Sequence, residues 1–520
     1  MKYPIIIAML MSAASALWGS SGCAYRLWLA DKEGSSHCAL SARALQRRAR
    51  WGIETDSADW SVSAAYIEAL RARGWQVLTT SRWLNTVVVC RPDGEAIDEA
   101  EWADLPWVTQ AEQVRGETST TMSAPAVRNK WAEDETSGQI TEKESQTSNQ
   151  ITENEGQISD QITESAAQAT EAWRAPMLQV GGEALYDAGW RGQGMLVAVL
   201  DGGYYGLDQL PGLMQRVVGW HDMYAPQDEA GEALWAASSH GTAVLSVMAA
   251  DTTMGVWGTA PDARYYVIRT EYDPTECPLE EDMWVAGAEM ADSLGADVIN
   301  SSLGYSIFDN SAYDHTWAQL GQRETFIQRG AVMAVERGML VCCAGGNDRR
   351  RVWQRMSMPA DDRSVMTVGG VDAQGVASYF SSVGWTTPYV KPDVCARATS
   401  AWVIDGQTGL PRTGSGTSYA CPLVCGLMTS LWSADTTLTV QQLMDVVRQS
   451  ASQVSQPDSL LGYGIPDFGR ALQMVLPGAS GIETLSHETE QPVCLPLWVS
   501  YRQNGCFIVQ NGCKKLLLGR

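Results

Sequence analysis

The sequence predicts an α/β protein with a mostly parallel central sheet between two layers of helices, preceded by a small α+β domain. Two observations support this fold class. Between residues 176 and 478, short and almost fully apolar runs alternate with stretches of helical character, as in parallel strands buried on both faces. Residues 25–115 show a similar alternation on a smaller scale. The apolar runs of the larger region are 195–200, 265–268, 296–300, 339–343 and 365–369.

Residues 1–24 have the order of a signal peptide: a basic residue, the apolar stretch 5–10, and then small residues. A buried N-terminal helix is the less favoured alternative. Cleavage after Ala16 and cleavage after Ala24 both fit the small residues, and a lipid-modified Cys23 is a weaker option. No stretch of the sequence is long and apolar enough to predict a transmembrane helix. We therefore expect an exported protein, with an extracellular, periplasmic or cell-surface location.

The charge balance argues against one class of partner. The 520 residues include 37 Lys and Arg against 60 Asp and Glu, a net charge of −23. Nucleic-acid-binding domains need a basic surface, so we expect no nucleic acid partner.

Twelve cysteines in an exported chain suggest disulfides, but their spacing does not predict a connectivity. Cys342, Cys343, Cys421 and Cys425 lie in apolar segments and are predicted to be small core residues. No Cys or His cluster has the spacing of a metal site, so none is predicted.

The small domain at 25–115 is predicted to contain strands at 25–29 and 86–90 and a helix at 63–73. Residues 116–175 then form an acidic, low-complexity segment rich in Ser, Thr and Gln. An eleven-residue repeat recurs within it at 137–142, 148–153 and 159–164. This period also suits a right-handed coiled coil, but so few apolar residues favour a mostly disordered linker.

Three polar side chains lie where the predicted strands and helices of the larger domain end or begin. Asp201 ends an apolar strand and is followed by two glycines, while His240 opens a helix. Ser418 lies among small residues, and Pro422 four positions later predicts that this serine begins a buried helix with the proline in its first turn. Sites in open parallel sheets form beyond the carboxyl ends of the strands, so we expect these groups to meet there.

Asp201, His240 and Ser418 supply an orienting carboxylate, a base and a nucleophile, the three roles that acyl transfer needs. Asn347 follows another predicted strand and offers an amide donor, which together with the Ser418 N–H predicts a site for an oxyanion. Taken singly, each residue has a plain alternative, such as a solvated turn aspartate or a structural histidine.

The motifs Asp201-Gly-Gly, His240-Gly-Thr, Gly346-Asn347 and Gly416-Thr-Ser418-x-Ala420-x-Pro422 appear in this order along the chain. The set resembles the subtilisin-like serine peptidases (subtilases), and a fifth match lies at 298–304. The resemblance covers roughly 176–475. It implies the subtilisin-like three-layer fold and a serine endopeptidase acting on polypeptide substrates.

The resemblance also implies a set of substrate-binding residues. One segment would pair with the substrate backbone as an extra strand, and another would form the opposite wall of the pocket for the residue before the scissile bond. These residues are Ser302, Leu303 and Gly304 in the first segment and Ala344, Gly345 and Gly346 in the second.

Three departures from the family pattern stand out. Gly202 takes the place of a Ser or Thr, which is expected to be tolerated. Gly345 takes the place of a common alanine, which predicts a slightly wider pocket, and residues 306–326 form an inserted loop beside the substrate groove. No cofactor is expected for catalysis. A structural calcium ion would suit the family but is assigned to no residues here.

The same resemblance implies that 25–115 is a propeptide, a chaperone and intramolecular inhibitor of the peptidase domain, and that maturation cleavage falls within 116–175. The alternative function is a binding or scaffold protein on the same fold, limited to cleaving itself. Retention of all four chemical groups of the site favours the peptidase.

Two further segments are open to two interpretations each. The tail, 479–520, has two hydrophobic runs around Asn-Gly turns that predict a small hairpin, which either packs on the peptidase domain or resembles a sorting segment. The strand at 265–268 is followed by acidic residues that form either a solvated loop, the favoured interpretation, or a rim selecting basic substrate residues. These acidic residues are Glu271, Asp273, Glu280, Glu281 and Asp282.

Overall fold

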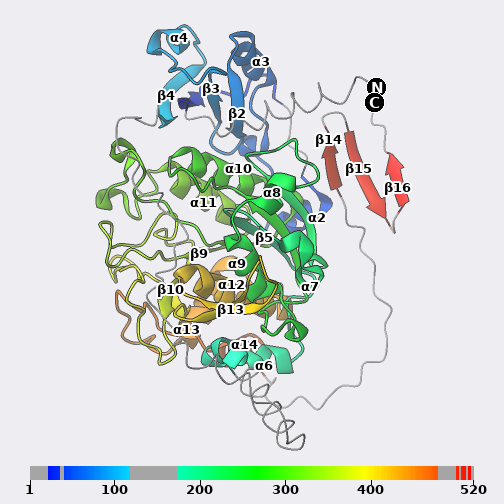
Figure 1. Cartoon of the computed structure of the whole chain (residues 1–520), viewed down its shortest axis with the longest axis vertical. Coiled ribbons are helices and arrows are strands. Elements are labelled where there is room, and N and C mark those ends of the chain that lie inside the picture. The colour runs from blue at the N-terminus through cyan, green and yellow to red at the C-terminus, as the bar shows by residue number, and fades with distance from the viewer. Residues whose placement is uncertain are drawn as a thin grey trace, which may run out of the picture. The chain divides into compact units, whose positions relative to one another are not determined.

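The computed structural model describes residues 22–35, 40–116 and 172–477, together with three strands of the tail (Figure 1). The predicted signal segment lies almost entirely outside the described residues, and so does most of the predicted acidic linker with its repeats. The chain divides into two units, residues 1–477 and residues 478–520, which are treated separately here.

A seven-stranded sheet forms the centre of the first unit, in the order β11-β10-β9-β8-β5-β7-β6. Every neighbouring pair in it is parallel, so the predicted parallel sheet is confirmed. The chain order reverses around β5, which lies between β7 and β8. Its strands are β5 (Leu196–Asp201), β6 (Val217–Asp222), β7 (Arg264–Arg269), β8 (Val298–Ser301), β9 (Leu340–Ala344), β10 (Met366–Val371) and β11 (Val394–Arg397).

Helices cover both faces of this sheet, as predicted for a three-layer fold. Because successive strand residues point to opposite faces, Val197 and Val199 of β5 pack with α9 and α12, whereas Ala198 and Leu200 pack with α10 and α11. The principal helices are α9 (His240–Ala249), α10 (Leu279–Leu294), α11 (Phe326–Glu336), α12 (Thr417–Ala434), α13 (Val440–Ser450) and α14 (Phe468–Val475). Shorter elements are α6 (Glu183–Asp187), α7 (Pro211–Met214), α8 (Glu232–Ala236), β12 (Ala401–Ile404) and β13 (Pro411–Gly414).

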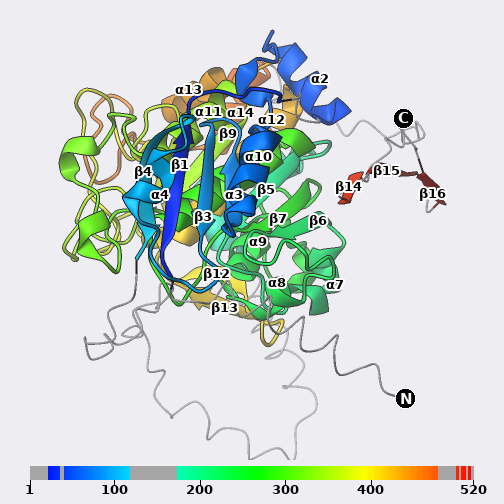
Figure 2. The same ribbon diagram turned by 90° about the horizontal axis from the view of Figure 1, so that it is seen from above.

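The small N-terminal domain is an antiparallel sheet in the order β2-β3-β1-β4 with three helices, which confirms its α+β character (Figure 2). Along β3, Val87 and Val89 point into the domain's own core, whereas Val88 and Cys90 belong to the apolar cluster that also contains α10 and α11. The domain therefore buries one face of its sheet against the larger domain. Its elements are β1 (Ala24–Leu29), β2 (Gln76–Ser81), β3 (Thr86–Cys90), β4 (Val108–Arg115), α2 (Ala42–Arg50), α3 (Ala64–Ala72) and α4 (Glu99–Ala103).

Buried ion pairs join this small domain to α10. Asp292 on α10 is fully buried and pairs with three arginines of the small domain: with Arg47, with Arg48 at 2.6 Å and with Arg82 at 3.0 Å. A second buried pair links Asp282 to Arg26 through two hydrogen bonds of 2.7 and 2.6 Å. Charges removed from water must be paired, so each side of the contact depends on the other.

The acidic residues at the start of α10 differ from both predictions made for them. Glu280, Glu281 and Asp282 lie in the first turn of the helix and are only 0%, 2% and 3% exposed, so they do not form a solvated loop. Negative charge in this turn is favoured by the helix dipole. Asp282 faces the small domain, and of the five acidic residues only Glu271 and Asp273 line the cleft described below.

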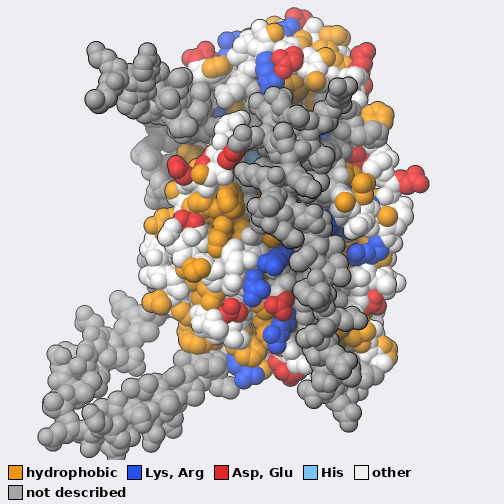
Figure 3. All heavy atoms as spheres, turned by 90° about the vertical axis from the view of Figure 1, so that its right-hand side faces the viewer, with side chains coloured by type: hydrophobic (Ala, Val, Ile, Leu, Met, Phe, Trp, Pro, Cys, Tyr) orange, Lys and Arg blue, Asp and Glu red, His pale blue; other side chains and the backbone are white. Residues whose placement is uncertain are grey.

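The structure describes the side chains of eight cysteines, and all eight are buried. The core positions predicted for Cys342, Cys343, Cys421 and Cys425 are confirmed. Within the same described part of the chain, no helix combines the length and apolarity needed to span a bilayer. On the face shown in Figure 3, the described acidic and basic side chains are interspersed.

The tail unit contains three antiparallel strands, β14 (Val499–Arg502), β15 (Gly505–Gln510) and β16 (Cys513–Leu516), with β15 in the middle. The predicted hairpin is therefore extended by one strand. The remainder of residues 478–520 lies outside the described residues, so the two interpretations of the tail stay predictions.

The substitution Asp292→Ala should destabilise the full-length protein. Removing one partner from a buried charge cluster typically costs about 3–5 kcal/mol, because the arginines left behind are unpaired. We expect a clear fall in the midpoint of thermal unfolding. Asp104→Ala is the matched control, because its pair with Arg73 is largely exposed and should contribute about 1 kcal/mol or less. Equal effects of the two substitutions would contradict the role given to Asp292.

Candidate active site

Asp201 and His240 meet at the carboxyl edge of the central sheet. Asp201 is the last residue of β5 and His240 is the first residue of α9. The His240 Nδ1 atom lies 2.7 Å from Asp201 Oδ1, and both side chains are buried. Asp201 Oδ1 also accepts a hydrogen bond of 2.8 Å from the Gly202 N–H. The carboxylate is thus placed to fix the orientation of the imidazole ring.

Two glycines make this meeting sterically feasible. The Gly241 N–H donates to the Gly203 carbonyl at 3.0 Å, so the start of α9 lies directly against the turn after β5. A Cβ atom at position 241 would lie 2.4 Å from that carbonyl oxygen and 3.0 Å from Asp201 Cβ. Gly203 has a φ of +151°, and a Cβ there would lie 2.5 Å from Ala237 Cβ. Gly203 and Gly241, one from each sequence motif, are therefore required by close packing.

Ser418 is the second residue of α12, so its N–H belongs to the first helical turn, where the helix itself supplies no acceptor. Pro422 lies in the second turn, as the sixth residue of the helix, so its predicted place in the first turn is wrong. Proline has no N–H, which leaves the Ser418 carbonyl without its helical donor. The Ser302 hydroxyl donates to this carbonyl instead, at 2.9 Å, and the Ser418 hydroxyl donates to the Ser302 carbonyl at 3.3 Å.

Asn347 is held by a residue that the sequence analysis did not single out. The Asn347 Oδ1 atom accepts hydrogen bonds from both the N–H and the hydroxyl of Thr417, each at 3.0 Å. With Oδ1 engaged in this way, the Nδ2 group remains as the donor that the side chain offers. The sequence signal for Thr417 is only its place beside Ser418, because its partner is distant along the chain.

One cleft of about 1290 Å³ brings the predicted site residues together. Its lining includes His240, Asn347 and Ser418. It also includes five of the six predicted substrate-binding residues, namely Ser302, Leu303, Gly304, Ala344 and Gly346. The ring of Tyr419, which follows Ser418, lies 6.0 Å from the His240 ring between centroids.

Gly345 is the exception among the predicted substrate-binding residues. It is buried behind the cleft, and a Cβ at this position would lie 2.8 Å from the sulfur of Met356 and 3.2 Å from the carbonyl of Val368. The space that an alanine would use is therefore filled by Met356. The expectation that glycine here widens the pocket is wrong, because it considered the local sequence without this packing partner.

The inserted loop at 306–326 lies between the cleft and the small domain. Ser306 and Ile307 line the cleft, while the Tyr313 hydroxyl donates to Gln113 of β4 at 2.9 Å. The loop is anchored by His315, whose Nε2 atom lies 2.6 Å from a Glu281 oxygen. Burial alone would lower the pKa of His315, but the Glu281 carboxylate raises it above its ordinary value.

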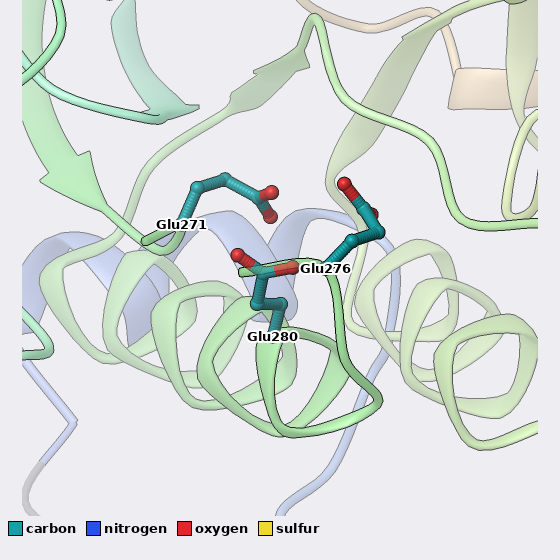
Figure 4. A group of neighbouring side chains, drawn as sticks. All are labelled: Glu271, Glu276 and Glu280. Carbon is teal, nitrogen blue, oxygen red and sulfur yellow. The ribbon is translucent and has the colours of Figure 1, made fainter. Parts of the chain in front are cut away.

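Three glutamates form a further group near the cleft (Figure 4). The side chains of Glu271, Glu276 and Glu280 approach one another, with carboxylate oxygens within 4.8 Å. The Glu280 carboxylate accepts a hydrogen bond of 2.9 Å from the Tyr272 N–H, and Glu271 accepts one from the Tyr305 hydroxyl. Calcium takes about six to eight oxygen ligands. Three carboxylates, two of them already accepting hydrogen bonds from the chain, fall short of that set, so we assign no calcium ion here.

A double-mutant cycle tests the link between Ser302 and the helix. Ser302→Ala should cost about 1–3 kcal/mol, because it leaves the buried Ser418 carbonyl without a donor. In a Pro422→Ala background the cost should be smaller, since the substituted residue carries an N–H that reaches this carbonyl. Chemical denaturation of the four proteins measures the coupling.

Ser430→Ala is the control for this cycle, because the Ser430 hydroxyl also donates to a carbonyl, that of Thr259, at 2.8 Å. Its cost should be the same in both backgrounds. A Ser302→Ala cost that does not depend on Pro422 would contradict the assignment.

The chain is similar in sequence to several known bacterial proteases. Subtilisin DY of Bacillus licheniformis is 31% identical over 164 residues, covering 31% of this chain and 54% of that protein. The thermostable alkaline protease of Halalkalibacterium halodurans is 28% identical over 290 residues, covering 55% of this chain and 70% of that protein. The chain spans about half the length of the first curated relatives that it matches.

Among solved structures, MycP1 from Mycobacterium smegmatis aligns with a TM-score of 0.45 and 22% identity, covering 59% of this chain and 87% of that one. The model for the peptidase S8 propeptide domain of Bacteroidota matches residues 24–130. The model for the subtilase family, peptidase S8, matches residues 192–464, more than half of the 520 residues. The chain therefore belongs to the subtilase family and carries a peptidase S8 propeptide domain ahead of its peptidase domain.

Proposed function

We propose that the protein is a serine endopeptidase that uses Asp201, His240 and Ser418 as its catalytic triad. The observation that carries the proposal is the 2.7 Å contact between Asp201 and His240 at a cleft that Ser418 also lines. A base held by a buried carboxylate beside a helix-borne hydroxyl is the arrangement that acyl transfer requires.

In the proposed reaction, His240 accepts the proton of the Ser418 hydroxyl while Oγ attacks the carbonyl carbon of the substrate. Asp201 accepts the Nδ1–H of His240, which keeps the other ring nitrogen available as the base and stabilises the ring when it becomes charged. His240 then donates its proton to the leaving amine. Water, activated by the same histidine, hydrolyses the acyl-enzyme and restores Ser418.

The developing oxyanion would be stabilised by the Asn347 Nδ2 group and the Ser418 N–H. Thr417 supports this role, because its two hydrogen bonds to Asn347 Oδ1 fix the amide before substrate arrives. The substrate backbone would pair with Ser302, Leu303 and Gly304, opposite the wall formed by Ala344 and Gly346. No cofactor takes part in this proposal.

We further propose that the N-terminal domain acts as the intramolecular inhibitor and folding partner of the peptidase domain, made as one precursor. Its sheet covers α10 and α11, and the Arg26–Asp282 and Asp292 ion pairs join the two domains. Maturation would then require cleavage between the domains, in the segment 116–175.

Export is proposed together with a refined signal boundary. Cys23 and Ala24 are 2% and 0% exposed, and the Cys23 N–H donates to the Gly94 carbonyl at 3.0 Å. The Gly22 carbonyl accepts a hydrogen bond of 2.7 Å from Arg115. Cleavage after Ala24 would remove these contacts, and a lipid on the buried Cys23 sulfur would disrupt them. We therefore favour cleavage before Gly22, as after Ala16.

Mass spectrometry of the secreted Ser418→Ala precursor tests the boundary. The expected N-terminal peptide begins upstream of Gly22 and contains an unmodified Cys23. A peptide that begins at Tyr25, or a lipid mass on Cys23, would overturn this proposal.

An active-site probe tests the catalytic proposal. A fluorophosphonate should label the processed wild-type protein at Ser418 and should not label the Ser418→Ala variant, which should also fail to degrade casein. Ser430→Ala serves as the matched control, because this serine lies on the same helix but is bonded to Thr259 and is not part of the cleft lining. Labelling of another serine would reject the triad. Wild-type labelling without casein turnover would favour the scaffold alternative.

A further inference from the structure

Two exposed arginines line the candidate active-site cleft immediately after the proposed oxyanion residue. Arg350 and Arg351 follow Asn347 by three and four positions, and both belong to the cleft lining. Neither guanidinium forms an ion pair with any residue that the structure describes. Arg350 lies over the ring of Tyr379 at 5.2 Å, and Tyr379 also lines the cleft. Two positive charges are thus presented to whatever the cleft binds.

The loop that carries these arginines also builds the pocket for the residue before the scissile bond. It leaves the sheet edge at Asn347 and returns at Ser357, which lies between the two pocket walls. A Cβ at Gly304 would lie 2.6 Å from Ser357 Cβ, and a Cβ at Gly346 would lie 2.7 Å from Ser357 Oγ. The two walls and this part of the pocket are therefore contiguous with the loop of Arg350 and Arg351.

The loop is held in place at several points on both sides of the arginines. The Arg349 N–H donates to the Phe380 carbonyl at 3.1 Å, and the Arg351 N–H donates to the Asp348 carbonyl at 2.8 Å. Trp353 is buried, and its indole N–H donates to the Met356 carbonyl at 3.0 Å. A fixed backbone reduces the entropy lost when the arginine side chains engage a ligand.

The remainder of the cleft carries the opposite charge. Glu271, Asp273, Glu276 and Asp309 line it on segments other than the one that carries the arginines, and Asp348 is the one acidic residue of the lining on the arginine loop itself. An acidic substrate side chain is repelled by these carboxylates and attracted by Arg350 and Arg351. Because two arginines outweigh the one carboxylate of Asp348 on this loop, the loop is the part of the cleft lining where an acidic side chain is favoured.

We propose that this peptidase prefers substrates with an acidic side chain directly before the scissile bond, and that Arg350 and Arg351 determine this specificity. Guanidinium groups match a carboxylate through paired N–H donors, and both arginines are exposed in the cleft lining. The inference rests on the proposed endopeptidase function and adds a substrate class to it.

Paired fluorogenic peptides that differ only by Glu or Gln before the cleaved bond test the proposal with the processed enzyme. We expect kcat/KM to be about tenfold higher for the Glu peptide, the size of two partly solvated charge pairs. The ratio should fall toward one in R350A/R351A and should persist in R350K/R351K, which keeps the charge. In R350E/R351E a Lys peptide should become the better substrate.

Two controls separate local charge from general effects. R363A/R470A removes two exposed arginines that are not part of the cleft lining and should leave the Glu to Gln ratio unchanged. The wild-type ratio should also fall between about 50 mM and about 500 mM salt, because added salt screens exposed charges.

Labelling and cleavage together separate the proposed specificity from the proposed peptidase activity. Equal cleavage of the Glu and Gln peptides, with normal fluorophosphonate labelling of Ser418, would overturn the specificity and leave the peptidase intact. An acidic preference that survives R350A/R351A, or one at a different substrate position, would also overturn it. Absence of both labelling and cleavage would reject the peptidase itself, and the specificity with it.

Discussion

The candidate site depends on a backbone contact that leaves no room for a side chain. The turn after β5 and the start of α9 touch through the hydrogen bond from Gly241 to Gly203, and this contact sets the separation of Asp201 from His240. Any Cβ at Gly241 would push the helix away from the strand, and the carboxylate would lose the imidazole. Packing of the main chain therefore determines the relative positions of Asp201 and His240.

Helix α10 connects the site to the N-terminal domain. Its first residues belong to the acidic region near the cleft, while Asp282 and Asp292 face the arginines of the propeptide domain. A surface helix with this many buried acidic groups would be costly on its own, because each carboxylate must lose water. The pairing with arginines offsets that cost. The buried acidic residues of this peptidase-domain helix therefore depend on arginines that the N-terminal domain of the same chain supplies.

The fold class and the three triad candidates were predictable from the sequence because their signals are local. Asp201 ends an apolar run and His240 begins a helix, and both patterns lie within a few residues. The contacts that were missed join distant segments. Met356 fills the space beside Gly345, Ser302 replaces the donor that Pro422 lacks, and Asp292 meets arginines from a domain some two hundred residues earlier. No short sequence pattern predicts such contacts, because neither residue of a pair carries a local signal that points to the other.

The arginine cluster around Asp292 has a consequence for the timing of activation. The proposed cut between the two domains would remove none of these ion pairs, so the severed halves would be expected to stay associated. Breaking the ion pairs one at a time would leave unpaired charges buried between the two domains. This cost raises the free-energy barrier to separation of the domains. Under the proposed maturation, slow dissociation of the two domains would therefore set the interval between the cut and the first turnover.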